Sequence, residues 1–250
     1  AKVIVVEPSR WLGGMTGGGL MHIDWGREEA VSGSTRPILK KDHNDAQYRA
    51  VFAEMLKSAG VTVLFEHRVS AAQKVDGVIR TIDLDLALFD EYGCPPSAPT
   101  KAGARIIAAK VFIDCSYEGD LMARAGVKYT VGRESNSVYN ETINGVQVRN
   151  LHQFKNDIKI DPYIMEGNPA SGLLPGIDPA PLGAIGSGDS RVQAYNFRMC
   201  MTQVATNRRP VKKPVSYNKA DYALVTRLLK TNYNEWFGKF DPIVMNKVDH

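Results

Sequence analysis

The sequence has few of the residues that build metal centres and disulfide frameworks. It holds three cysteines in 250 residues, Cys94, Cys115 and Cys200, and no two of them form a C-x-x-C pair. Its five histidines are scattered without the spacing of zinc ligands. We therefore expect no metal site and no redox disulfide, and we interpret Cys115 and Cys200 as small buried apolar side chains.

Long apolar runs and a strong charge of one sign are also missing. No run approaches the roughly 20 apolar residues that a membrane-spanning helix needs. The net charge is +4, with 44% hydrophobic and 23% charged residues, which is typical of a globular protein. The densest basic cluster, Arg208-Arg209 with Lys212-Lys213, is flanked by prolines and has no interleaved aromatic residues. It predicts an exposed loop rather than a nucleic-acid surface. The sequence does not predict the cellular compartment.

A G-x-G-x-x-G loop is absent as well, although its usual companion is present. Residues 2–6 form an apolar run that ends in Glu7. In dinucleotide-binding folds such an acid holds a ribose and follows the glycine loop by about 20 residues. Because only six residues precede Glu7, we expect the first strand of such a fold and its phosphate loop to be missing.

A glycine cluster follows this strand closely. Residues 13–19 contain five glycines. Glycines let backbone N–H groups approach a phosphate or a flat ring where a Cβ would clash. A flexible loop is the alternative, but so many glycines after a buried strand are costly to order without a ligand. The cluster therefore predicts ligand contact.

Regular elements are expected through the first half of the chain. Residues 44–59 repeat apolar side chains at helical spacing and end at Gly60, and residues 61–65 follow as a strand. Residues 82–88 alternate between apolar and polar side chains, which predicts a strand with one solvent-exposed face. After a proline-rich turn, the apolar residues 106–113 predict a strand buried on both faces of a parallel sheet.

A short helix over 121–125, ending at Gly126, completes this half. Prolines and glycines between 160 and 190 exclude long regular elements there, and a helix is expected from Ala220 to about Trp236. We therefore divide the chain at 131/132 into a nucleotide-binding domain, 1–131, and a substrate region, 132–250.

Five segments together resemble a known family. They are residues 6–15, 16–20, 112–121, 126–134 and 193–202. This set resembles the FAD-dependent oxidoreductases that share the glutathione-reductase-type FAD fold, some of which carry xanthan lyase-like names. The resemblance implies an α/β fold, a Rossmann-like three-layer FAD/NAD(P)-binding domain that is here truncated at its N-terminus, with an inserted β-rich substrate region.

The resemblance also implies which residues contact FAD. Glu7 would hold the adenosine ribose with Arg10 beside it, and Val69 would offer backbone groups to adenine. The glycine cluster would follow the pyrophosphate, ribityl chain or flavin. A second strand–turn–helix would return to the cofactor. The residues implied in these last two segments are Gly13, Gly14, Met15, Thr16, Ser116, Gly119 and Asp120.

Fewer residues are candidates for the catalytic step than for FAD binding. By the same resemblance His22 and Asp24 would lie near the flavin, and His22 is the better acid–base candidate because its intrinsic pKa lies near neutrality. A hydrogen-bonded structural histidine is the alternative. Arg133 would anchor an anionic or hydroxylated substrate, or would pair with Glu134. Tyr195, Asn196 and Arg198 belong to the resembling segments but are equally consistent with an interior position.

Three functions remain open from the sequence. The first is a flavin-dependent hydride transfer to or from a small-molecule or sugar-type substrate. The second is a non-catalytic fragment or binding module with an incomplete cofactor site. The third is a protein related to polysaccharide lyases, which rests on family naming alone. An unpaired strand edge beside residues 2–6 further predicts a homo-oligomer.

Overall fold

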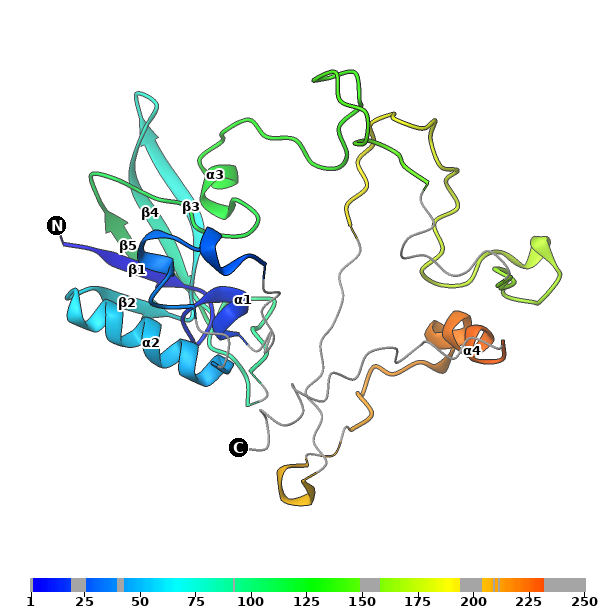
Figure 1. The fold of residues 1–250 in the computed structure, drawn as a ribbon, viewed down its shortest axis with the longest axis horizontal. Coiled ribbons are helices and arrows are strands. Elements are labelled where there is room, and N and C mark those ends of the chain that lie inside the picture. The colour runs from blue at the N-terminus through cyan, green and yellow to red at the C-terminus, as the bar shows by residue number, and fades with distance from the viewer. Residues whose placement is uncertain are drawn as a thin grey trace. The chain divides into compact units, whose positions relative to one another are not determined.

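The structure, a computed structural model, describes residues 2–18, 26–39, 43–91, 93–148, 158–193, 204–208, 210 and 212–231. The chain divides into two compact units, Ala1–Tyr129 and Thr130–His250. The elements of unit 1 are β1 (Ile4–Glu7), α1 (Gly14–Gly17), 3-10 turns at Glu28–Ala30 and Gly33–Thr35, α2 (Asp45–Ser58), β2 (Thr62–Phe65), β3 (His67–Val75), β4 (Val78–Leu86), β5 (Lys101–Ala108) and α3 (Asp120–Arg124) (Figure 1).

Helix α2 forms where the apolar periodicity predicts it. Asn44 caps it: the Asn44 side chain accepts from the Gln47 amide at 2.9 Å, and the Gln47 side chain accepts from the Asn44 amide at 2.9 Å. Gly60, in the left-handed region at φ 66°, ends the helix, and Tyr48 is its buried residue. The predicted helix is confirmed.

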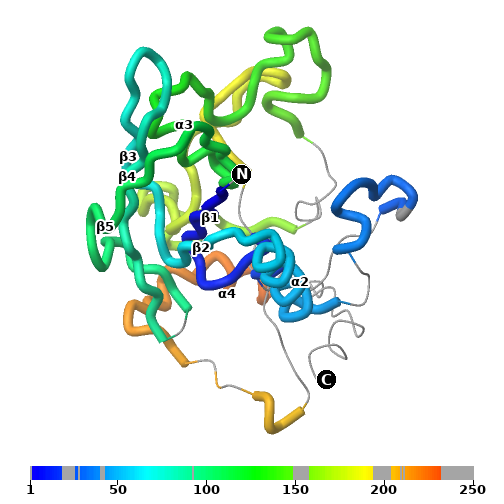
Figure 2. Tube along the Cα trace, turned by 90° about the vertical axis from the view of Figure 1, so that its left-hand side faces the viewer, coloured from blue at the N-terminus to red at the C-terminus, as the bar shows by residue number. Residues whose placement is uncertain are grey.

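Two sheets pack on one core in unit 1. β1 and β2 pair in parallel, from Ile4 opposite Thr62 to Glu7 opposite Phe65, and α2 supplies the crossover. β3, β4 and β5 form an antiparallel sheet. Figure 2 shows β1 and β2 between α2 and this sheet. The core residues Ile82, Leu84 and Leu121 meet partly buried side chains of both sheets, among them Val6, Leu64, Val69 and Phe112.

The prediction for residues 106–113 is wrong. β5 ends at Ala108, runs antiparallel to β4 and lies at the edge of its sheet, so Ile106 is 70% exposed. Val111 and Ile113 lie outside any strand and are exposed, and of this stretch Phe112 packs on the core. An apolar run does not distinguish a central strand from an edge strand, because the neighbours that cover it come from elsewhere in the chain.

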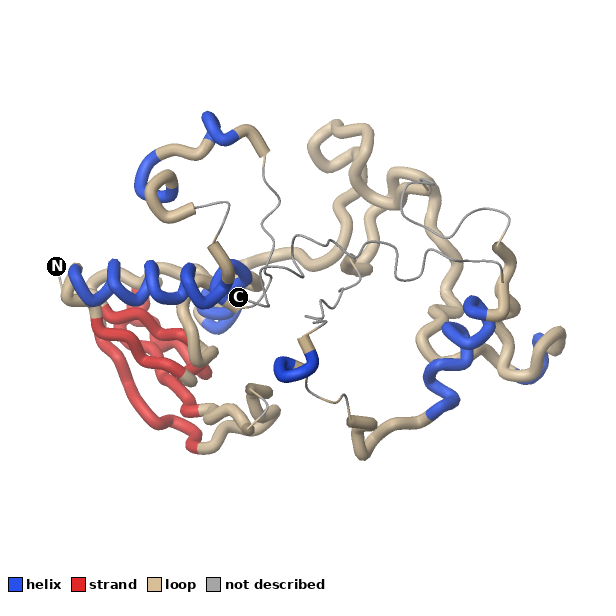
Figure 3. The backbone as a smooth tube through the Cα atoms, turned by 60° about the horizontal axis from the view of Figure 1, so that its bottom comes forward, coloured by secondary structure: helices blue, strands red, loops and turns tan. Residues whose placement is uncertain are grey.

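Unit 2 has little regular structure in its described residues. Its elements there are 3-10 turns at Pro169–Ser171, Ala205–Asn207 and Lys219–Tyr222, and helix α4 (Ala223–Leu229). Figure 3 shows strands in unit 1 alone, and the described part of unit 2 has only two isolated bridges, Arg133 with Asp189 and Tyr163 with Leu173. The expected β-rich region is therefore not found there.

Helix α4 also differs from its prediction. It begins at Ala223, because residues 219–222 form a 3-10 turn capped by the Asn218 side chain on the Ala220 amide at 3.1 Å. The expected end near Trp236 lies outside the described residues.

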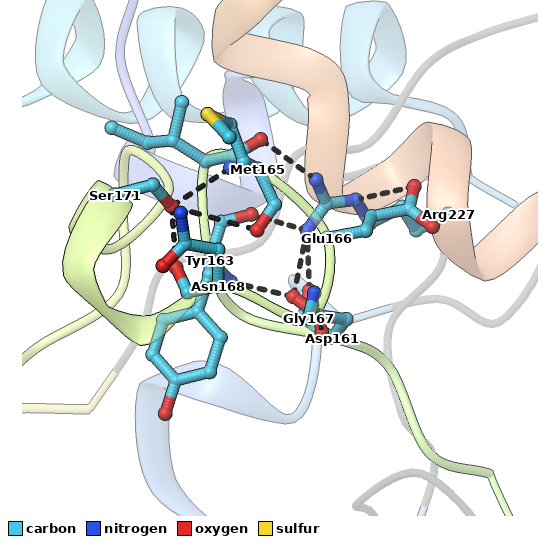
Figure 4. Close-up of polar contacts among 9 residues, drawn as sticks. Asp161, Tyr163, Met165, Glu166, Gly167, Asn168, Ser171 and Arg227 are labelled. Carbon is cyan, nitrogen blue, oxygen red and sulfur yellow. Dashed lines mark hydrogen bonds and ion pairs between the residues drawn. The ribbon is translucent and has the colours of Figure 1, made fainter.

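Arg227 ties α4 to the loop that precedes the Pro169 turn (Figure 4). Its guanidinium donates to the carbonyl oxygens of Asp161 at 2.7 Å, Tyr163 at 2.6 Å and Ile164 at 3.1 Å. It also pairs with Glu166 at 3.2 Å. The Asp161 carboxylate accepts from the amides of Tyr163 and Gly167, and the first of these bonds is the main reason that the Asp161 pKa is lowered. One partly buried arginine thus binds the backbone of a loop that forms no sheet.

Candidate functional site at the carboxyl ends of β1 and β2

Glu7 lies at the carboxyl end of the parallel strand pair. It is the last residue of β1, and its Oε1 accepts from the Ser9 amide at 2.8 Å. Its Oε2 makes no hydrogen bond to any other residue that the structure describes. Ligands of open α/β sheets bind outside the carboxyl ends of parallel strands. Glu7 therefore combines the expected position with a carboxylate oxygen that can accept from a hydroxyl.

Arg10 is held beside this end by Glu66, which the sequence prediction missed. The Arg10 Nε donates to Glu66 Oε1 at 2.9 Å, and its guanidinium also donates to the Phe89 carbonyl and lies 5.4 Å from the Phe89 ring centroid. The Phe89 amide donates to the same Glu66 oxygen at 2.8 Å. The bond from Phe89 and then that from Arg10 lower the Glu66 pKa. The position of Glu66 directly after β2 is the sequence signal that could have identified this residue.

The glycine turn owes its composition to contacts within the chain. Gly13 and Gly14 have positive φ, 99° and 52°. A Cβ on Gly13 would lie 2.5 Å from the Phe52 ring, and one on Gly14 would lie within 3.0 Å of the Tyr117 hydroxyl. Side chains from α2 and from the segment before α3 therefore occupy the positions that a Cβ on either glycine would need.

Tyr117 is a further residue that the prediction missed. Its hydroxyl accepts from the Met15 amide at 2.7 Å, and the Thr16 amide donates to Gly13 at 3.0 Å. Met15 itself is exposed. Tyr117 thus joins the glycine turn to the second strand–turn–helix segment, which lies about 100 residues later in the chain.

Ser116, Gly119 and Asp120 organise the start of α3. Ser116 Oγ donates to the Asp114 carboxylate at 2.6 Å and accepts from the Asp120 amide at 2.7 Å. The Asp114 carboxylate also accepts from the Met122 amide at 2.9 Å, and the Ser116 bond is the main cause of its lowered pKa. Gly119 has φ 71°, and Asp120 pairs with Arg124 at 3.1 Å. The predicted residues come together here, as a helix cap.

Val69 and the cysteines have other surroundings. Val69 lies in β3 opposite Leu84, and its side chain packs against the core of unit 1. Cys115 was predicted to be buried but is exposed, because the segment that holds it forms no strand. Cys94 is exposed as well. Cys200 lies outside the described residues.

The catalytic candidates do not meet in the described structure. His22 and Asp24 lie outside the described residues, as do Tyr195, Asn196 and Arg198. Arg133, in unit 2, donates from Nε to Asp189 Oδ1 at 2.8 Å and from Nη2 to Asp189 Oδ2. This paired geometry lowers the Asp189 pKa. The partner of Arg133 is therefore Asp189, and the expected alternative of a pair with Glu134 is wrong.

Two searches of the described residues bear on the kind of site. No group of three or more histidine, cysteine or acidic residues is arranged to hold a metal ion among them. In the same part of the chain, no helix has the length and apolarity needed to cross a membrane.

Comparison with known proteins supplies the family. The family model described as FAD dependent oxidoreductase matches residues 1–248, which is nearly the whole chain. The comparisons with curated proteins and with solved structures gave no match.

Proposed function

Because the chain belongs to the FAD-dependent oxidoreductase family, we propose that the carboxyl end of the β1–β2 pair holds the adenosine end of FAD. The observation that carries this proposal is the position of Glu7, whose Oε1 is fixed by the Ser9 amide. Its Oε2 is then oriented to accept from the hydroxyls of a ribose. The acceptor chemistry of this carboxylate fits the cofactor of the family.

Other residues around Glu7 support the same assignment. Arg10 is immobilised by Glu66 and Phe89, so its guanidinium is held at a fixed place near the strand ends, where the Glu66 carboxylate balances its charge. The glycine turn, braced by Phe52 and Tyr117, forms the wall next to it. FAD supplies the hydride chemistry when bound, so the chain needs to bind, orient and handle protons.

The reaction we propose is hydride transfer between a carbon that bears oxygen or nitrogen and the flavin. The substrate is a small molecule or a sugar-type compound, and unit 2 would supply its contacts. His22, close to the glycine cluster in the sequence, is the residue we propose to move the proton.

The Glu7→Gln variant tests the adenosine site. Glutamine keeps the size of the side chain but loses the charge, and a charge-assisted hydrogen bond contributes about 1.5–3 kcal/mol. We therefore expect FAD to bind at least about tenfold more weakly. Titration of flavin-free protein with FAD, followed by flavin absorbance at ~450 nm, measures this change.

The matched control is Glu29→Gln, an exposed acid in the Glu28–Ala30 turn, which should bind FAD as the original protein does. If Glu7→Gln keeps full affinity, the adenosine lies elsewhere. If the original protein takes up no flavin at all, the non-catalytic binding module becomes the better proposal.

We also propose that the open edge of β1 pairs with a second copy of the chain. β1 pairs with β2 on one edge, and among the described residues nothing pairs with its other edge, where Val3 and Ile4 are 44% and 42% exposed. Light scattering should find a dimer that Ile4→Lys converts to monomer, because a charge on an edge strand opposes pairing.

Val75→Lys is the control for this dimer. It places the same charge on an apolar residue that is similarly exposed, at 53%, but at the end of β3. A monomeric original protein, or equal loss of the dimer in both variants, contradicts the proposal.

A further inference from the structure

A cleft in unit 2 is lined by residues to which no functional role has been assigned so far. It has a volume of about 460 Å³ and is lined by Lys212, Lys213, Pro214, Tyr217 and Tyr222. This volume is within the range of sites for small molecules, about 300–1,000 Å³. The residues come from a proline-flanked basic segment, from Tyr217 just after it, and from Tyr222 in the 3-10 turn that precedes α4.

Its charge is of one sign. Both charged residues in the lining are lysines. Lys212 has no ion pair or hydrogen bond with any residue that the structure describes. Asp221, the nearby acid in the 3-10 turn, accepts from the Asn218 side chain at 3.1 Å and is absent from the lining. The two ammonium groups therefore offer an attractive position for an anion.

Its apolar surface consists of aromatic rings. The rings of Tyr217 and Tyr222 stack with their centroids 5.2 Å apart and their planes 18° apart, and Lys213 Nζ lies 4.3 Å from the Tyr217 centroid. Both tyrosines remain partly exposed. The basic segment has no interleaved aromatic residues in the sequence, but the fold places these two tyrosines beside it. A flat ring can pack against such a pair.

We propose that this cleft binds a small anion that carries a planar aromatic ring. The anionic group lies at the Lys212–Lys213 pair, and the ring packs against Tyr217 and Tyr222. The lysines alone would attract any anion, and the tyrosines alone would attract any ring. The combination selects a ligand that has both groups.

Three probes separate these contributions: phenyl phosphate carries ring and charge, inorganic phosphate carries the charge, and phenol carries the ring. Ligand-observed NMR titrations use the full chain loaded with FAD and then freed of unbound cofactor, so that the cofactor site cannot capture a probe and no free FAD competes for the cleft. We expect phenyl phosphate to bind about tenfold more tightly than either other probe, and more weakly as salt is added. Equal affinity for phenyl phosphate and phosphate, or no binding of phenyl phosphate, overturns the proposal.

Variants locate the binding. Lys212→Ala should weaken phenyl phosphate binding about tenfold. Tyr222→Leu should reduce its affinity to that of phosphate, and circular dichroism checks that α4 persists. Lys219→Ala is the matched control, because Lys219 is an exposed lysine of the same unit outside the lining. An equal loss in Lys219→Ala, or unchanged binding in Lys212→Ala, overturns the proposal whether or not Tyr222→Leu folds.

Discussion

Replacing Gly17 with alanine is expected to destabilise unit 1 by about 3 kcal/mol, the upper end of what overpacking usually costs. A Cβ at this position would lie within 3.0 Å of the Leu12 carbonyl oxygen and 3.2 Å from Arg49 Cγ. The first neighbour is backbone and cannot move aside without displacing the glycine turn. Arg49 Nη1 donates to the Gly17 carbonyl at 2.7 Å, so the turn is also tied to α2.

Calorimetry measures this effect as a fall in the unfolding temperature of roughly 10 °C. FAD affinity should fall with it, because the turn forms a wall of the proposed cofactor site. Gly26→Ala is the matched control: neither glycine has a positive φ, and a Cβ on Gly26 meets nothing within 4 Å. The control should change stability by less than about 0.5 kcal/mol. Equal losses in the two variants would show that the crowding at Gly17 is not the cause.

Local signals predicted the elements whose stabilising groups lie close together in the sequence. Asn44 and Gln47 cap α2 three residues apart, and Gly60 ends it. The short helix before Gly126 is confirmed for the same reason, since Gly126 adopts φ 66° directly after it. Capping and glycine termination need no knowledge of the rest of the chain.

Contacts between distant residues explain what the sequence did not predict. The glycine turn was predicted as a ligand contact, whereas the side chains that require glycine there, Phe52 and Tyr117, come from α2 and from the segment before α3. Arg10 was assigned to the cofactor site without Glu66, which lies 56 residues away. No periodicity indicates which distant side chain will occupy the space above a glycine. The family is therefore better predicted than the details of the site.

Unit 2 shows the same limit more clearly. Its prolines and glycines correctly exclude long elements between 160 and 190. They do not reveal that Arg227, 66 residues after Asp161, organises the loop. In a segment without sheet or long helix, the backbone carbonyls that turns leave unpaired must be satisfied by side chains or water. Arg227 therefore adds donors for three carbonyl oxygens to a loop that its own turn bonds and the Tyr163–Leu173 bridge also hold.

Arg227→Ala is accordingly expected to destabilise unit 2 by about 2–4 kcal/mol, because it removes several hydrogen bonds from a side chain that is 12% exposed. The carbonyl oxygens of Asp161, Tyr163 and Ile164 would lose their donor together. Hydrogen exchange reports the change locally, at the amides of Tyr163 and Gly167 that donate to Asp161. We expect their exchange to accelerate at least about thirtyfold, the equivalent of about 2 kcal/mol.

Two comparisons make this result specific. Arg227→Lys keeps the charge but presents a single ammonium, which cannot reach the carbonyls as the forked guanidinium does, so it should recover part of the protection. Arg124→Ala removes an exposed pair with Asp120 within α3 and should leave exchange in unit 2 unchanged, because such pairs contribute little. If Arg227→Ala leaves both amides protected from exchange, other contacts hold the loop and Arg227 does not contribute to its stability. If lysine restores full protection, charge rather than the fork organises residues 161–167.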